Sequence, residues 1–196
     1  MAEKIAIIGA GISGLCSALA LQMKGFQVTV YEREEYHAAQ GPGLILGRNA
    51  LLALEALGIG TSIYQAGNAG EDFTIYSERG QPIANIHSKQ RSKMAPFLFI
   101  RFESFFKILR NAIHPETIIY GKELVDFEEG VNGVQIRFKD GSEESADYLL
   151  ACDGKDSLVR ARLFPGSEPQ STGYTVCGGI LNGEKISACA IAKHGG

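Results

Sequence analysis

Apolar and polar positions follow two different periods over the first 32 residues. Residues 4–8, KIAII, are almost entirely apolar, residues 9–25 place apolar side chains at helical spacing, and residues 26–32, FQVTVYE, alternate. Short apolar or alternating runs rich in β-branched residues favour strands, whereas a period of 3.6 favours a helix. The pattern therefore predicts a strand–helix–strand unit with two parallel strands, buried on both faces and joined by a right-handed crossover.

The pattern after residue 32 predicts a mixed α/β chain. A charged and then glycine-rich loop is expected over 33–47, and residues 117–152 are predicted to form a three-stranded meander that leads into a buried strand, from Leu149 to Cys152. A meander of short strands separated by turn residues is typical of an antiparallel sheet. The other predicted elements are helices at 48–58, 102–113 and 157–163, two strands within 72–86, and two strands at 174–181 and 185–192.

Composition and charge narrow the possible partners. The chain has 196 residues, 45% of them hydrophobic and 21% charged, with a net charge of −3 and no run of Lys or Arg. Nucleic acid is therefore not an expected partner. No apolar run approaches the roughly 20 residues of a membrane helix, so no membrane association is expected. The four histidines are scattered, and none is placed with an acid at metal-ligand spacing, so no metal site is expected.

The four cysteines indicate a reducing compartment. Cys16, Cys152, Cys177 and Cys189 form no Cys-x-x-Cys pair, and the first two lie within apolar patterns. A buried free thiol behaves as a small hydrophobic group, whereas disulfides belong mainly to secreted proteins. We therefore expect a cytoplasmic protein.

A glycine motif stands between the first strand and the first helix. Gly9, Gly11 and Gly14 fit G-x-G-x-x-G, and Glu32 ends the second strand 18 residues further on. In this context the glycines allow a tight turn, close approach of a pyrophosphate and close helix packing, while the acid accepts hydrogen bonds from ribose hydroxyls. Ser13 is interpreted as a donor on the phosphate side. The alternative is a glycine-rich turn that binds no ligand.

Four segments together resemble the FAD-dependent monooxygenases of the para-hydroxybenzoate hydroxylase class. The first, KIAIIGAGISGLCSALALQMKGFQVTVYERE, is shared with other flavoproteins and by itself implies FAD only. Three more segments narrow the resemblance, and it covers residues 4 to about 183 in the family's order. These segments are GPGLILGRNALLALEALGI, FIRFESFFKILRNAI and ADYLLACDGKDSLVRARL.

The resemblance implies an FAD site with further contributors. It assigns Asp153 and Gly154 to FAD and to the nicotinamide cofactor, and Arg101 to FAD; a solvated cation at a helix start is the alternative for Arg101. Arg48 stands where the family usually has proline, so it is either a cofactor contact or an exposed loop residue. The strand that contains Val125 is expected to pass the adenine, with the side chain in the core and only the backbone facing the base. Arg33 is assigned to the same site.

The resemblance also implies a reaction. In this class NADH or NADPH reduces FAD, and a flavin hydroperoxide then hydroxylates a small, often aromatic substrate, so no catalytic side chain is assigned. The implied fold is a Rossmann-like FAD-binding domain with a parallel sheet and β-meander, at 1–70 and 98–165, plus part of a β-rich substrate domain, at 71–97 and 166–196. Two alternatives stay open: a non-catalytic FAD- or nucleotide-binding remnant, and a protein similar to flavin-dependent isoprenoid reductases.

One family motif is missing from the sequence. The class carries a late Gly-Asp motif beside the flavin phosphates, and this chain contains no Gly-Asp dipeptide. The chain is therefore expected to be the N-terminal portion of a longer monooxygenase.

Overall fold

The computed structural model describes residues 2–35, 43–70, 72–87 and 97–175. The chain divides into two compact units: Met1–Ala38 with Phe106–Pro169, and Ala39–Phe105 with Gln170–Gly196. The strands expected at 174–181 and 185–192 lie outside the described residues, apart from residues 174 and 175.

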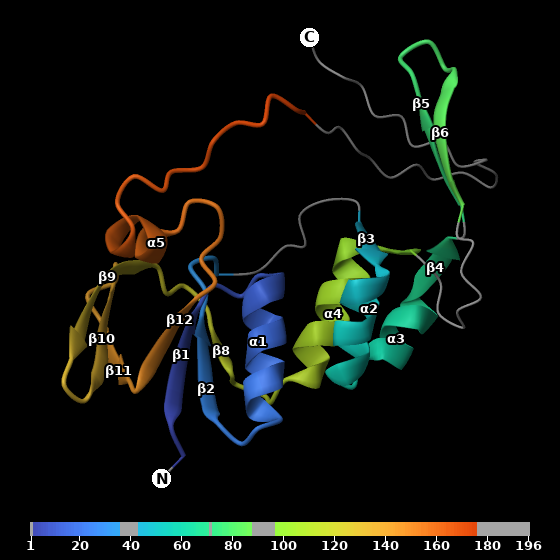
Figure 1. The fold of residues 1–196 in the computed structure, drawn as a ribbon. Helices are drawn as coiled ribbons and strands as arrows, with labels where there is room; N and C mark the ends of the chain where they lie inside the picture. The colour runs from blue at the N-terminus through green and yellow to red at the C-terminus, as the bar shows by residue number, and fades with distance from the viewer. Residues whose placement is uncertain (1, 36–42, 71, 88–96, 176–196) are drawn as a thin grey trace. The chain divides into compact units, whose positions relative to one another are not determined.

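A four-stranded parallel sheet organises the first unit. Its strand order is β12-β1-β2-β8, and every neighbouring pair is parallel. Helix α1 connects β1 to β2 and lies on one face of the sheet (Figure 1). The predicted strand–helix–strand unit and the Rossmann-like class are thus confirmed. The elements are β1 (Lys4–Ile8), α1 (Ile12–Gln22), β2 (Gln27–Tyr31), β8 (Ile118–Ile119) and β12 (Tyr148–Ala151).

The meander covers the other face of this sheet. Strands β9 (Leu124–Gly130), β10 (Gly133–Phe138) and β11 (Glu143–Ala146) pair antiparallel in the order β11-β10-β9. The predicted meander is confirmed, but it begins at Leu124 and not at residue 117, because residues 118 and 119 pair with β2 instead. Ala6, Ile8 and Tyr31 of the parallel sheet belong to one buried cluster with apolar side chains of the meander. Side chains alternate along a strand, so Ile7 and Val30, both fully buried, point to the opposite face, which α1 covers. Burial on both faces explains why residues 5–8 carry no polar side chain.

Helix α5 (Leu158–Leu163) follows β12 and closes one end of the meander (Figure 1). Val159 enters the same buried cluster. Arg162 pairs with Asp126 of β9, and its guanidinium lies 5.2 Å from the centre of the Phe127 ring. These contacts attach α5 to the meander, and α5 in turn ends the loop that contains Asp153 and Gly154.

Two burial predictions for this unit are wrong. The strand expected to be buried, β12, lies at the edge of the parallel sheet among the described residues, with Tyr148 55% and Leu150 36% exposed. A strand with a neighbour on one side only keeps much of its surface in contact with solvent. Val125 was expected in the core but is 44% exposed, because it alternates with Leu124, and Leu124 is the residue that points inward.

The second unit contains a three-stranded antiparallel sheet and a separate hairpin. The sheet order is β3-β7-β4, and β5 pairs with β6. The sequence pattern predicted α2, the hairpin and α4, but it missed β3, β4, β7 and α3. The elements are β3 (Leu44–Gly47), α2 (Arg48–Ala56), α3 (Gly60–Ala66), β4 (Gly67–Gly70), β5 (Asp72–Tyr76), β6 (Pro82–His87), β7 (Phe97–Ile100) and α4 (Phe102–Ala112), which crosses the division between the units.

In the part of the chain that the structure describes, no helix combines the length and apolar character needed to cross a membrane.

Candidate cofactor-binding site

The three glycines of the motif differ in what surrounds them. Gly9 has φ +100°, and a Cβ there would lie 2.4 Å from the carbonyl oxygen of Cys152. A Cβ on Gly14 would lie 1.9 Å from the carbonyl oxygen of Gly9, so the helix approaches the turn closely. A Cβ on Gly11 would meet no atom within 4 Å. Gly9 and Gly14 are therefore needed for packing, whereas Gly11 faces open space.

The N-terminus of α1 borders this open space. Gly11 is the N-cap and has no side chain that could accept a hydrogen bond from the helix N–H groups. The first turn contains no acidic residue. The first hydrogen bond of the helix type joins the Leu15 N–H to the Gly11 carbonyl, at 3.0 Å. The N–H groups of the residues before Leu15 have no acceptor within the helix. The start of a helix attracts anions through such N–H groups and through its dipole. The exposed hydroxyl of Ser13 lies in the same turn.

Glu32 follows the last residue of β2, beside the glycine turn, and is 7% exposed. Its Oε2 accepts a hydrogen bond from the Ala10 N–H at 2.7 Å, and its Oε1 accepts one from the Glu34 N–H at 3.0 Å. A carboxylate offers about four acceptor positions, so acceptor capacity is left for ribose hydroxyls. Sequence reasoning missed the bond to Ala10, which gives Glu32 a second role: it holds the glycine turn against the end of β2.

The loop after β12 reaches the same edge of the sheet. The Cys152 N–H donates to the Ile8 carbonyl at 2.9 Å, and a Cβ on Gly9 would lie 3.4 Å from the Cα of Asp153. Gly154 has φ +84°, a conformation that favours glycine. The glycine motif and the Asp-Gly pair, about 140 residues apart in the sequence, are therefore neighbours at the carboxyl ends of β1 and β12.

Two side chains cap α5 and shape this loop. Ser157 is buried at the N-cap, and its Oγ accepts from the Arg160 N–H at 2.9 Å. The Oδ2 of Asp153 accepts from the Val159 N–H at 3.3 Å. Capping oxygens of this kind satisfy N–H groups that the helix cannot pair. The carboxylate of Asp153 is thus oriented by the helix that follows it.

Charged side chains meet where β2 and β12 end. A hydrogen bond from Lys155 to Asp156, at 2.8 Å, lowers the pKa of Asp156, and the positive charges of Arg33 and Arg160 act in the same direction. Arg33 follows Glu32 directly and also pairs with Glu34 at 3.5 Å. The positive charge of Arg33 therefore acts on the loop that follows β12.

The other predicted contributors come from other segments of the chain. Arg48 begins α2 directly after β3, and Arg101 follows β7. The antiparallel register, Leu44 opposite Ile100, puts these arginines at opposite ends of the β3–β7 ladder, roughly 15 Å apart along the strands. Both belong to the second unit, so their part in the site stays a prediction. The same holds for the backbone of Val125 in β9.

Gly43 shows why the glycine-rich loop needs glycine before β3. A Cβ at this position would lie 2.6 Å from the carbonyl oxygen of Ile100 and 3.5 Å from the Cα of Arg101. The loop therefore runs directly against the backbone that precedes α4. Residues 41 and 42 of the same loop lie outside the described residues.

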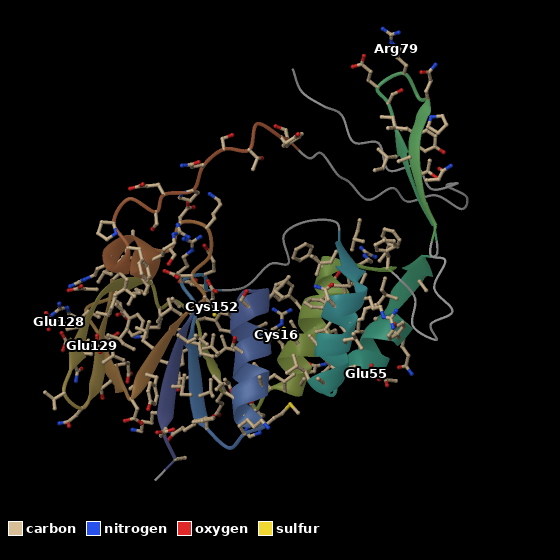
Figure 2. All side chains as sticks on the ribbon, viewed as in Figure 1. Cys16, Glu55, Arg79, Glu128, Glu129 and Cys152 are labelled. Atoms are coloured by element: carbon tan, nitrogen blue, oxygen red, sulfur yellow. The ribbon has the colours of Figure 1, made fainter. Side chains whose placement is uncertain are left out.

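Cys152 is a residue of this site that sequence reasoning treated only as core. Figure 2 labels it at the end of β12, beside α1. Burial, with the nearby Asp153 carboxylate as a smaller cause, raises the pKa of its thiol, and the nearby Ser17 side chain of α1 acts in the opposite direction. Its position directly before Asp153-Gly154 is the one sequence signal that could have identified it.

Comparison with known proteins gives the same assignment as the geometry. A model of the FAD binding domain family matches residues 2–185. Aurachin C monooxygenase/isomerase from Stigmatella aurantiaca is 30% identical over 180 residues, covering 91% of this chain and 47% of that protein. 6-Hydroxynicotinate 3-monooxygenase from Pseudomonas fluorescens is 30% identical over 175 residues, covering 87% and 46%. The chain thus spans about half the length of these relatives.

A solved structure with the same fold is 2,6-dihydroxypyridine-3-hydroxylase from Arthrobacter nicotinovorans. It superposes with a TM-score of 0.73 at 28% identity, covering 89% of this chain and 42% of that one. The family match extends from the first strand past the Asp-Gly loop and includes both motifs that the fold brings together. The chain belongs to the FAD binding domain family.

Proposed function

We propose that this chain is the FAD-binding part of a monooxygenase that uses NADH or NADPH to hydroxylate a small aromatic substrate. The observation that carries the proposal is the meeting of the glycine turn, Glu32 and the Asp-Gly loop at one edge of the parallel sheet. Ligands of open α/β sheets bind at the carboxyl ends of the strands, where these residues lie.

The residues present fit the separate parts of FAD. The open space at Gly11 and the start of α1 suit the pyrophosphate. The spare acceptor positions of the buried Glu32 carboxylate suit ribose hydroxyls, and its negative charge disfavours a 2′-phosphate at the same place. Asp153 and Gly154 complete this edge. We assign Arg33, Arg48, Arg101 and the Val125 backbone to the same cofactor as further contacts.

The protein's part in the reaction is to bind and orient the cofactor. FAD, when bound, supplies the chemistry, since it accepts a hydride from the nicotinamide and activates oxygen. Ser13 and the first N–H groups of α1 donate to phosphate oxygens, and Glu32 accepts from the ribose. None of the chain's residues is assigned a catalytic role.

The similar proteins and the free thiols support a substrate class and a location. Two similar proteins are named for 6-hydroxynicotinate and 2,6-dihydroxypyridine, which are small hydroxylated aromatic rings. Residues 71–97 and 166–196 are assigned to the substrate side. Among the described residues Cys16 and Cys152 are free thiols, which supports a reducing, cytoplasmic location.

A two-step assay tests this function. The apoprotein is first titrated with FAD, and the loaded protein is then mixed with NADH or NADPH and oxygen, with and without hydroxylated pyridines and benzoates. Ring-stimulated oxidation of the nicotinamide, with a hydroxylated product, is expected. FAD binding without ring stimulation favours the non-catalytic alternative, and reduction of an isoprenoid alkene favours the reductase alternative. The absence of FAD binding contradicts the whole proposal.

A further inference from the structure

Cys152 lies between the two motifs of the FAD site. Its carbonyl oxygen limits the space at Gly9, because a Cβ on Gly9 would come within 2.4 Å of it. Its N–H donates to Ile8, the last residue of β1, at 2.9 Å. Asp153 follows it directly. The backbone of this one residue therefore contacts the glycine turn on one side and begins the Asp-Gly loop on the other.

The side chain of Cys152 points to α1. Its Cβ is 3.5 Å from the place that a Cβ on Gly14 would occupy, and its thiol lies near the Ser17 side chain. Gly14 and Ser17 are three residues apart and so share one face of the helix. The half-buried side chain of Cys152 thus lies between the end of β12 and the start of α1.

The side of Gly14 that faces Cys152 has little room for a further group. Gly14 is buried against the Gly9 carbonyl, where a Cβ would come within 1.9 Å. A side chain larger than cysteine at position 152 is therefore expected to crowd the start of α1 and to push it away from β12. Such a movement displaces the N–H groups that face the open space at Gly11, because they belong to the same turn of the helix.

We propose that Cys152 is a positioning residue for FAD: its small volume sets the distance between the start of α1 and the Asp-Gly loop. The inference rests on the FAD binding proposed above, but it concerns size at one position and not the chemistry of the thiol. It predicts that alanine is tolerated at 152 and that larger side chains weaken FAD binding.

The test compares Cys152→Ala, Cys152→Leu and Cys16→Leu with the unchanged chain. Cys16 is a matched control, since it is a half-buried free thiol on α1 but lies on a different side of the helix from Gly14 and Ser17. Two quantities are measured: the dissociation constant for FAD, from quenching of flavin fluorescence, and amide hydrogen exchange of residues 11–17 without FAD. Urea unfolding shows which variants are folded.

The expected result is a loss confined to the large side chain at 152. Cys152→Leu should weaken FAD binding at least tenfold, about 1.4 kcal/mol, and speed amide exchange at the start of α1. Cys152→Ala should weaken FAD binding much less than Cys152→Leu does, and Cys16→Leu should stay within about threefold of the unchanged chain. If Cys152→Leu does not fold, Cys152→Val replaces it, with a smaller loss in the same direction.

Other results overturn the inference in distinguishable ways. A folded Cys152→Leu with unchanged FAD affinity shows that volume at 152 does not position the site. Equal losses in Cys152→Ala and Cys152→Leu show that the thiol itself matters. An unchanged chain that binds no FAD refutes the proposed function, while unaltered amide exchange of α1 in Cys152→Leu refutes the positioning role independently of FAD.

Discussion

Replacing Gly11 by alanine should separate cofactor binding from folding. Gly11 has φ −70° and ψ −175°, which alanine adopts freely, and an added Cβ meets no atom within 4 Å. Alanine is a poorer N-cap than glycine, which lowers the free energy of unfolding. Alanine also restricts the unfolded chain, which raises that free energy by about 0.4–1 kcal/mol, so the two effects largely cancel. The free energy of unfolding, measured in urea, should therefore stay within about 1 kcal/mol of the unchanged chain.

FAD affinity should fall in the same variant. The new methyl group occupies the space through which a phosphate oxygen reaches the first N–H groups of α1. Losing one hydrogen bond to a charged group costs about 1.5–3 kcal/mol. This cost corresponds to a dissociation constant for FAD that is roughly 10- to 150-fold larger. Quenching of flavin fluorescence during titration of the apoprotein measures this constant directly.

Gly14→Ala is the matched control, with the same change three residues away. Its Cβ would lie 1.9 Å from the Gly9 carbonyl oxygen, so α1 has to move, and overpacking of this kind costs about 1–3 kcal/mol of stability. Gly11→Ala should thus lose FAD affinity while keeping its stability, whereas Gly14→Ala should lose stability. A Gly11→Ala chain that binds FAD as before refutes the placement of the phosphates at Gly11. A Gly11→Ala chain that loses as much stability as Gly14→Ala shows that the space beside Gly11 is not open.

Two further predictions concern Glu32 and Tyr31. Glu32→Ala should lower the free energy of unfolding by roughly 1–3 kcal/mol, because the buried Ala10 N–H loses its acceptor, and should also weaken FAD binding. Glu32→Gln retains one carbonyl oxygen and should lose less stability; equal urea midpoints for all three chains would be inconsistent with the bond. Burial, with the Glu144 carboxylate as a second cause, raises the pKa of Tyr31 to about 12. The associated stability is present below pH ~10 and is lost as the pH rises toward 12, so alkaline unfolding should be weaker in Tyr31→Phe; identical pH profiles would contradict this.

Local sequence was sufficient for the parts of the fold with strong periodicity. β1, α1 and β2 follow from apolar runs and a glycine motif, each of which depends on neighbouring residues. β4, with the sequence GNAG, has no such signal. It is a strand because it pairs with β7, about 30 residues later, and a Cβ on Gly67 would lie 2.8 Å from the Leu98 side chain. Pairing over such distances is not encoded in a local pattern.

The candidate site shows the same division between local and long-range causes. Spacing alone identified Glu32 as an acid at the end of a strand, but not its bond to Ala10, which depends on how the turn folds back. Val125 was placed in the core because it is apolar. Its exposure depends on the register of β9 with β10, where the pairing shifts between Arg137 and Phe138.

Amide hydrogen exchange with and without FAD tests the central claim, that one edge of the parallel sheet in the first unit binds this cofactor. The account predicts that FAD slows exchange in residues 11–14, at the start of α1, and around Asp153 and Gly154. FAD that binds without slowing exchange in either segment would contradict the account, and so would a chain that binds no FAD at all.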